Sequence, residues 1–229
     1  MTNDIADWFP ILKATGVKVP RTEIIQTECD LLMLLDSKEP KGFKKFEREL
    51  SKACNRIGFP LFLRSGHISG KHDWNETCYV KTAAELDSHI AGIIEYGELS
   101  SLIGFPWNTW AIRELLPTIP LFVAFHGMPV TKERRYFIKN GEVICHHPYW
   151  PVDSIECAST TNWSNLLVES NQESEDEITM LTQMSRLVSN SFEGAWSIDW
   201  LFTKIGWFAI DMARACDSYH WPDCKNAVE

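Results

Sequence analysis

The sequence predicts an α+β fold in which antiparallel strands and packed helices form one domain or two closely joined lobes. Three segments carry apolar residues at steps of three and four, as in helices that pack on a core: 40–57, 83–98 and 178–188. Strand-like segments lie between them, and Asn140-Gly141 is a strong signal for a hairpin between antiparallel strands. With 229 residues and 45% hydrophobic content, the chain can bury a large core.

The N-terminal part and the middle of the chain predict shorter elements. Segment 8–27 mixes turn formers with short apolar runs, so we expect a short helix, a loop and a brief strand near 23–26. A further strand is expected at 120–125, and the tail 216–229 reads as irregular. Within the tail, Ser218, Tyr219 and His220 follow closely enough on the preceding strand to border a site.

Composition excludes several classes of protein. The net charge of −9 disfavours nucleic-acid binding by bulk electrostatics. No apolar run approaches the roughly 18 residues of a membrane span. Segment 1–10 has neither the basic start nor the apolar centre of an export signal. We therefore expect a cytoplasmic protein without a membrane partner, and we do not expect nucleic acid as a partner.

Seven cysteines are scattered along the chain without a CxxC pair. This pattern indicates reduced thiols rather than a disulfide framework. Four residues of metal-binding type lie near one another in sequence: Cys145, His146, His147 and Cys157. Their spacing matches no zinc pattern, so we favour a strand with small buried thiols there.

Segment 195–214 predicts a β-hairpin with one acidic residue in the middle of each strand. If residues 204–206 form a three-residue loop with Gly206 in the left-handed conformation, Asp199 lies opposite Asp211. Opposed Cβ atoms are about 4.5–5.5 Å apart, so the two carboxylates would repel each other or share a divalent ion such as Mg²⁺. Two alternatives are a chance alignment at the rim of the sheet and a one-residue slip that sends the aspartates to opposite faces.

Two further segments place basic residues near turns or beside an acid. A strand at 61–63 leads through Arg64 into a loop with Ser69 and Lys71, which can offer backbone N–H groups and positive charge to phosphates. The loop is not a Walker motif, and an ordinary solvated hairpin loop is the alternative. The strand 133–139 puts Glu133 and Arg135 on one face, where an exposed salt bridge is the alternative to a functional pair.

Taken in order, four motifs resemble those of ATP-grasp enzymes: PLFLRSGHISGKHDW, WAIRELLP, ERRYF and WSIDWLFTKIGWFAIDMAR. The resemblance covers about residues 60–215. It is nearest to small ATP-grasp proteins frequent in bacteriophages and bacteria and to the family of cell division cycle protein 123. It implies two lobes of antiparallel sheet with packed helices that clamp a nucleotide. The implied divisions are a helical segment at 1–58, a smaller lobe at 59–116 that ends in the hinge strand, and a larger lobe at 117–229.

The resemblance also implies roles for individual residues. Phosphates would meet Arg64, Ser69 and Lys71, and the adenine edge would meet the backbone of Ile112, Arg113, Glu114 and Leu115. Arg135 would neutralise the transferring phosphoryl group with Glu133 orienting it, and together with Lys71 these residues form the implied catalytic set. Asp199 and Asp211 would hold Mg²⁺ on the phosphates of ATP.

The sequence departs from the family pattern at two places. Relatives usually carry Asn two residues after the second metal acid, whereas this chain has Ala213, so Asp217, Ser218 or water would have to supply that ligand. The larger ligases also carry a complete α/β domain ahead of the grasp. Segment 1–58 is too short for one, which leaves the site of the second substrate open.

The leading functional hypothesis is an ATP- and Mg²⁺-dependent ligase that joins a carboxylate to an amine or similar nucleophile through an acyl-phosphate. The alternative is a non-catalytic ATP-binding assembly factor that docks a protein partner, for which three tryptophans flanked by polar residues could mark the surface: Trp150, Trp163 and Trp221. A purely structural α+β protein without a nucleotide is the third possibility.

Overall fold

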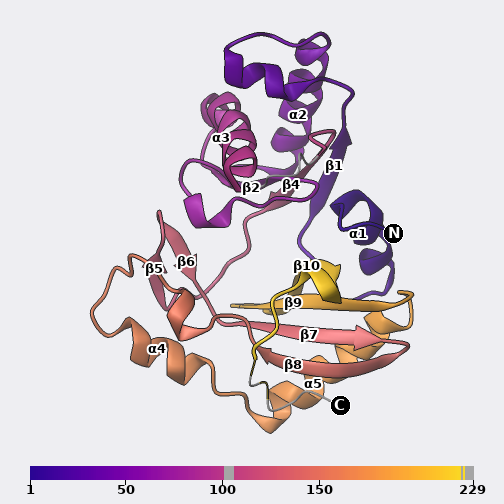
Figure 1. Ribbon diagram of the computed structural model, residues 1–229, viewed down its shortest axis with the longest axis vertical. Coiled ribbons are helices and arrows are strands. Elements are labelled where there is room, and N and C mark those ends of the chain that lie inside the picture. Colours follow the sequence, from indigo (N-terminus) through magenta and orange to yellow (C-terminus); the bar gives the residue numbers. More distant parts are fainter. Residues whose placement is uncertain (101–105, 223, 225–229) are drawn as a thin grey trace.

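Two four-stranded antiparallel sheets form the framework, one in each of two lobes (Figure 1). The computed structural model describes residues 1–100, 106–222 and 224. In spatial order, the smaller lobe has β1 (Thr22–Gln26), β4 (Thr109–Glu114), β2 (Leu61–Ser65) and β3 (Tyr79–Val80). The larger lobe has β10 (Gly206–Arg214), β9 (Ala195–Thr203), β7 (Glu133–Lys139) and β8 (Glu142–Pro148). The predicted α+β class with antiparallel sheets is confirmed.

Two helices pack on the smaller sheet, α2 (Phe43–Ile57) and α3 (Leu86–Ser100). Their apolar stripes were expected from the sequence, and residues such as Leu50 and Ile90 are fully or almost fully buried beside Trp110 of β4. Burying a side chain of this size contributes about 1.5–3 kcal/mol. The two helices therefore hold the sheet that carries β2 and β4.

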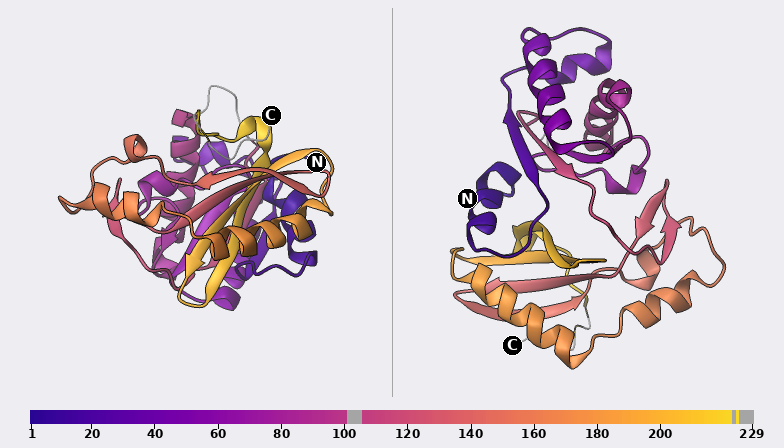
Figure 2. Two further views of the ribbon diagram at one scale, coloured as in Figure 1. Left: turned by 90° about the horizontal axis from the view of Figure 1, so that it is seen from below. Right: turned by 180° about the vertical axis from the view of Figure 1, so that it is seen from behind.

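Helix α5 (Glu175–Ser189) packs on the larger sheet, on the side away from the smaller lobe (Figures 1 and 2). It begins where the hydroxyl of Ser174 accepts a hydrogen bond from the backbone N–H of Glu177. Its buried Leu181 and Val188 join a core with Trp196 and Trp200 of β9. Helix α5 thus packs on the larger sheet, which contains the β9–β10 hairpin, and supports it from one face.

A smaller unit lies beside the larger sheet and consists of β5 (Phe122–Ala124), β6 (Met128–Val130) and α4 (Trp163–Ser170). The sequence predicted the first strand but neither the second nor the helix, because both are too short to show a period. Trp150 belongs to this core and is 3% exposed. The suggestion that Trp150 marks a docking surface is therefore wrong, and Trp163 is also partly buried here.

The N-terminal segment is divided between the lobes. Helix α1 (Ile5–Ala14) buries Trp8 and Leu12 in the core of the larger lobe, whereas β1 completes the smaller sheet beside β4 (Figures 1 and 2). Residues 1–58 are thus shared by the two lobes, because the apolar face of α1 needs the larger core. The remaining short 3-10 helices are η1 (Leu31–Asp36), η2 (Lys71–Asp73), η3 (Ala83–Glu85), η4 (Val152–Ser154) and η5 (Ala215–Asp217).

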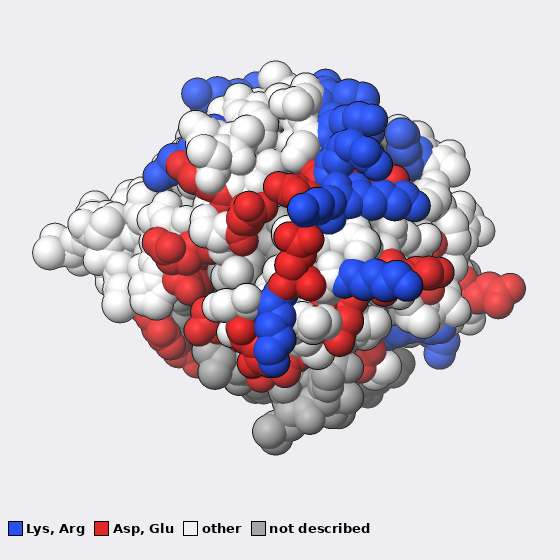
Figure 3. Space-filling model, turned by 90° about the horizontal axis from the view of Figure 1, so that it is seen from above, with Lys and Arg blue, Asp and Glu red and all other residues white. Residues whose placement is uncertain are grey.

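The outer face of the smaller lobe carries charges of both signs. In Figure 3, Lys and Arg side chains gather on one part of this face, and Asp and Glu side chains lie beside and below them. In and next to α2, Nζ of Lys44 lies 4.0 Å from Oε1 of Glu39, and Nζ of Lys45 lies 4.0 Å from Oε1 of Glu49. Among the described residues, no helix is both long enough and apolar enough to cross a membrane.

Candidate functional site

A cleft of about 350 Å³ lies between the lobes and is lined by residues of both. Nine of the residues singled out in the sequence line it: Arg64, Ser69, Lys71, Arg113, Glu114, Leu115, Glu133, Asp199 and Asp211. Segments that are far apart in the chain thus converge on one concave surface, as in most ligand sites.

Two of the expected residues do not line this cleft. Ile112 is fully buried in the middle of β4, where it lies between Glu23 of β1 and Leu63 of β2. Ile112 belongs to the core of the smaller lobe, and the next residues along the chain, Arg113 to Leu116, line the cleft instead. Arg135 stands behind Asp199, to which it is paired.

The β9–β10 hairpin places the two aspartates opposite each other, as predicted, but by a different path. Thr203 pairs with Gly206 across a two-residue loop, so the predicted three-residue loop is wrong. Gly206 has a positive φ of 108°. The register then shifts at a bulge between Ala209 and Asp211, and Asp211 comes opposite Asp199. The extra residue in the strand has the same effect on register as the extra loop residue that we expected.

The bulge also connects the lobes. Nη1 of Arg113 in β4 donates to the carbonyl of Ile210, the bulged residue, at 2.6 Å, and its Nε donates to Thr22 Oγ1 at 3.3 Å. Nη2 of Arg113 is buried and has no hydrogen-bond partner among the described residues. Burial, with a smaller effect from Arg64, lowers the pKa of Arg113 to about 9, so the group remains positively charged at neutral pH.

Each aspartate of the hairpin is paired with an arginine. Nε and Nη2 of Arg135 donate to the two carboxylate oxygens of Asp199 at 2.7 and 2.8 Å, directly across β7 and β9. Nη1 of Arg64 in the smaller lobe lies 2.9 Å from Oδ1 of Asp211. Both carboxylates are therefore paired with cations, Asp211 with Arg64 of the cleft lining and Asp199 with Arg135 of its own sheet.

Lys71 lies in a cage of aromatic and acidic groups. Its Nζ donates to the hydroxyl of Tyr149 at 2.9 Å, lies 3.9 Å from Oε2 of Glu133 and stands 4.6 Å from the ring centroid of Trp150. Burial alone would lower the pKa of Lys71, but Tyr149 and Glu133 outweigh it and raise the pKa above its ordinary value. Lys71 is thus a fixed positive charge.

Glu133 is placed beside Lys71 rather than beside Arg135, which it was expected to orient. Its Oε1 accepts hydrogen bonds from Trp150 Nε1 at 3.1 Å and from Thr131 Oγ1 at 3.2 Å. Burial raises the pKa of Glu133, and the charge of Lys71 opposes this rise. Glu133 and Trp150 therefore position Lys71 in the cleft.

Local backbone geometry explains why the loop before Lys71 contains glycine. Gly70 has a φ of 63°, and a Cβ there would lie 2.9 Å from Cβ of Thr77. The hydroxyl of Thr77 donates to the carbonyls of Gly70 and Asp73 at 2.6 and 2.7 Å. The loop is thus anchored internally just before η2 presents Lys71.

A wall of aromatic residues in the cleft was not predicted. Phe62 of β2 and Tyr79 of β3 both contact Trp74, with ring centroids 5.7 and 5.6 Å away, and the Trp74 and Tyr79 rings are nearly parallel at 19°. All three line the cleft. The sequence could have indicated this wall, since Trp74 and Tyr79 lie close together just before and at the start of β3, the strand that pairs with β2. Such a wall can stack against a planar ring.

The carboxylates are compatible with a magnesium site. Two opposed carboxylates that line one cleft supply hard oxygen ligands of the kind that Mg²⁺ prefers, and Mg²⁺ needs few protein ligands when phosphates supply others. The suggested substitutes for the missing Asn are engaged elsewhere. Asp217 Oδ2 accepts from Asn3 at 2.8 Å, and Ser218 Oγ lies 2.6 Å from Ser197 Oγ.

Comparison with known proteins shows the fold. No family model matches the sequence, and no curated protein sequence matches it. Among solved structures, the chain is similar to C-terminally truncated Cdc123 from Schizosaccharomyces pombe, with a TM-score of 0.61, 10% identity, and coverage of 93% of this chain and 83% of the other. It is also similar to a RimK domain ATP-grasp protein from Sphaerobacter thermophilus, with a TM-score of 0.52, 13% identity, and coverage of 94% and 60%.

A third similar structure is carboxyaminoimidazole ribonucleotide synthase from Aspergillus clavatus complexed with ATP, with a TM-score of 0.54, 12% identity, and coverage of 95% of this chain and 46% of the other. The chain therefore spans about half of this enzyme and 60% of the RimK domain protein. These likenesses define the class: the chain has the ATP-grasp fold, and its predicted relationship to ATP-grasp proteins and Cdc123 is confirmed at the level of the fold.

Proposed function

We propose that the chain binds ATP with Mg²⁺ in the cleft between its lobes and activates a carboxylate as an acyl-phosphate for attack by an amine or similar nucleophile. The observation that carries the proposal is the pair of opposed aspartates, each held by an arginine, at the cleft surface. ATP-grasp ligases of known structure include one complexed with ATP, which supports the choice of nucleotide.

Two groups of residues that line the cleft suit the two parts of ATP. The aromatic wall of Phe62, Trp74 and Tyr79 offers flat apolar surface for adenine, and the cleft edge at Leu115 lies where β4 ends. Around the aspartates, the positive charges of Arg64, Lys71, Arg113 and Arg135 are grouped to receive phosphates. Planar guanidinium groups can bind phosphate oxygens through two hydrogen bonds at once.

Binding can proceed by an exchange of ion-pair partners. Arg64 and Arg135 are held by Asp211 and Asp199 at hydrogen-bond distance, so they are already oriented toward acidic groups. When bound, Mg²⁺ neutralises phosphate charge and gives the carboxylates a new partner. Arg64 would then be free to bind phosphate oxygens, and Nη2 of Arg113 would gain a partner, whereas Arg135 would stay with Asp199 within the larger sheet.

The residues supply positioning and electrostatic stabilisation. In phosphoryl transfer the protein mainly aligns the reacting groups and neutralises the charge that develops on the oxygens. Lys71 is fixed by Tyr149 and Glu133 and provides a preorganised charge without further reorganisation. The substrate carboxylate would meet the same cations, which fits a ligase that forms an acyl-phosphate.

The test of nucleotide binding is the thermal stability of the full chain with ATP and Mg²⁺. A ligand that binds the folded state at a hundred times its dissociation constant stabilises it by about 2.7 kcal/mol. We expect a clear rise in melting temperature with both ligands and a smaller rise with ATP alone. Asp153→Asn, at an exposed aspartate outside the cleft, is the control and should keep the rise, whereas Lys71→Met should lose most of it. No rise in the unaltered protein would reject the proposal.

A second candidate function is an ATP-binding assembly factor without turnover. It is favoured by the similarity to Cdc123, of which this chain covers 83%, and by Ala213 in place of the usual metal-binding Asn. Phosphate release in the presence of pooled carboxylic acids and amines separates the two functions. Stimulated release supports the ligase, whereas a thermal shift with no release under any pool supports the assembly factor.

A further inference from the structure

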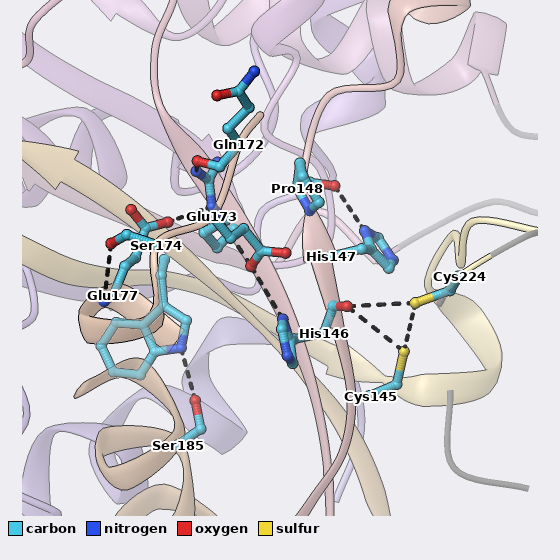
Figure 4. A network of polar contacts seen from close by, with 12 residues as sticks. Cys145, His146, His147, Pro148, Gln172, Glu173, Ser174, Glu177, Ser185 and Cys224 are labelled. Carbon is cyan, nitrogen blue, oxygen red and sulfur yellow. Dashed lines mark hydrogen bonds and ion pairs between the residues drawn. The ribbon is translucent and has the colours of Figure 1, made fainter. Parts of the chain in front are cut away.

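The C-terminal segment returns to strand β8 and brings three soft metal-binding atoms together. They are Sγ of Cys145, Nε2 of His220 and Sγ of Cys224, and all lie within 4.8 Å of one another. Cys145 Sγ is 2.9 Å from His220 Nε2 and 2.9 Å from Cys224 Sγ. In Figure 4 the Cys145 side chain from β8 and the Cys224 side chain from the tail point toward each other. This cluster is separate from the cleft, since none of the three lines it.

A fourth candidate ligand lies beside this cluster. His147 is two residues from Cys145 on β8, so both side chains lie on one face of the strand. Its ring centroid is 5.3 Å from that of His220. His147 is 2% exposed, and its Nε2 is buried with no hydrogen-bond partner among the described residues. A buried nitrogen without a partner is costly, and a metal ion would satisfy it.

The second nitrogen of His147 is already arranged as in a metal ligand. Its Nδ1 donates to the carbonyl of Pro148 at 2.7 Å, as Figure 4 shows. Histidine ligands commonly donate their other N–H to a carbonyl, which leaves the lone pair of the opposite nitrogen directed at the metal. The ring of Trp221 stacks on His147 with centroids 5.4 Å apart and shields this side from water.

The ligand chemistry selects the metal. Two thiolates and two imidazoles are the donor set of tetrahedral structural zinc sites, and they are unsuited to Mg²⁺ or Ca²⁺. His220 and Cys224 are separated by three residues, a spacing found in the second ligand pair of many zinc sites. A disulfide is the competing arrangement, but the sulfur atoms are 2.9 Å apart, whereas a disulfide bond is about 2.05 Å long.

We propose that Cys145, His147, His220 and Cys224 form a structural zinc site that fastens the C-terminal segment to β8. The two cysteines bind as thiolates, each releasing a proton to solvent, and the histidines bind as neutral imidazoles. The site does not depend on the function proposed for the cleft. The segment that carries His220 is also held to the larger sheet, because the carbonyl of Tyr219 accepts a hydrogen bond from Nη1 of Arg135 at 3.1 Å.

The first test measures bound metal in the full chain, purified with reductant and then incubated with Zn²⁺. We expect one zinc per chain, and we expect Co²⁺ in its place to give the intense visible absorption of a tetrahedral thiolate site. Cys145→Ser and Cys224→Ser should each remove the metal. Cys157→Ser and Cys216→Ser are matched controls at exposed cysteines and should retain it.

Further variants separate metal binding from folding. His220 and Cys224 are only partly buried, so His220→Ala and Cys224→Ala should fold with unchanged circular dichroism while they lose zinc. His147→Ala removes a ligand and should weaken zinc affinity by at least about tenfold to a hundredfold. The proposal is overturned if the reduced chain binds no zinc, if zinc is retained by Cys145→Ser, or if mass spectrometry finds a Cys145–Cys224 disulfide that persists in reductant.

Discussion

Asp199 and Asp211 face each other across one hairpin, yet their arginine partners come from different parts of the molecule. Arg135 belongs to the same sheet as Asp199, and their side chains are 13% and 8% exposed. Arg64 belongs to the other lobe, and its partner Asp211 is 35% exposed. The first pair is therefore part of the larger lobe's structure, whereas the second pair joins the two lobes. The ion pair of Asp199 lies within one sheet, whereas the ion pair of Asp211 depends on the position of the smaller lobe.

The largest expected effect comes from breaking the pair inside the lobe. Asp199→Ala leaves the mostly buried Arg135 without its carboxylate, and loss of one partner of a buried pair costs about 3–5 kcal/mol. Chemical denaturation should show this loss in the free energy of unfolding. A loss below about 1 kcal/mol would mean that solvent or Tyr149 replaces Asp199, and the contrast between the two pairs would fail.

Removal of the bulge tests how the second aspartate is held. Deletion of Ile210 should keep Asp211 opposite Asp199, because one residue is removed from the strand at the point where the register shifts. It also removes the carbonyl that accepts from Arg113, which leaves buried N–H groups unpaired at a cost of about 1–3 kcal/mol. Ile210→Ala keeps that carbonyl and is the control. Urea denaturation of both variants, with ATP and Mg²⁺ binding measured alongside, separates the role of the bulge in lobe contact from its role in register.

The pair between the lobes should matter more for ligand binding than for stability. Asp211→Asn keeps an oxygen that can accept from Arg64, so the free energy of unfolding should fall by about 1 kcal/mol or less. The thermal shift with ATP and Mg²⁺ should nevertheless be lost, since an amide is a poor ligand for Mg²⁺. A shift equal to that of the unaltered chain would show that Asp211 has no part in nucleotide binding.

The smallest effect is expected at an exposed pair of similar length. Arg186 and Glu142 lie 2.8 Å apart, but their side chains are 53% and 63% exposed. Arg186→Ala should therefore change the free energy of unfolding by only about 0–0.5 kcal/mol. This variant is the reference for the other variants. A larger change in the free energy of unfolding would show that burial does not explain the greater effect expected for the Asp199 pair.

The sequence predicted the hairpin and the alignment of its two aspartates, although the predicted loop length was wrong. Apolar residues around Asp199 and Asp211 predict strands that are covered on both faces, and this allows few registers, although only β9 is an inner strand and β10 lies at the edge of the sheet. The loop was one residue shorter than expected, and a bulge at Ile210 restored the alignment. The bulge leaves little trace in the sequence of the hairpin itself. Its carbonyl, that of Ile210, accepts a hydrogen bond from Arg113, which lies far away in the chain.

Features that depend on distant parts of the chain could not be predicted in this way. The sequence suggested an exposed Trp150, but it is buried among apolar residues of β5, β6 and α4, and its indole N–H donates to Glu133. The metal-binding cluster joins Cys145 to His220, 75 residues away, and the spacing around Cys145 alone gave no zinc pattern. Only the path of the folded chain brings these groups together.

The division of the N-terminal segment constrains how the lobes can move. The chain passes between the lobes twice, once after α1 and once after β4. The two passages are joined by a hydrogen bond from the backbone N–H of Glu114 to the carbonyl of Arg21, and both touch the hairpin tip, through Lys18 to Ile205 and through Lys204 to Pro117. Two adjacent covalent connections resist twisting and sliding but permit rotation about the line through them. The cleft should therefore open as a one-axis swing that separates Arg64 from Asp211 while Arg135 stays with Asp199.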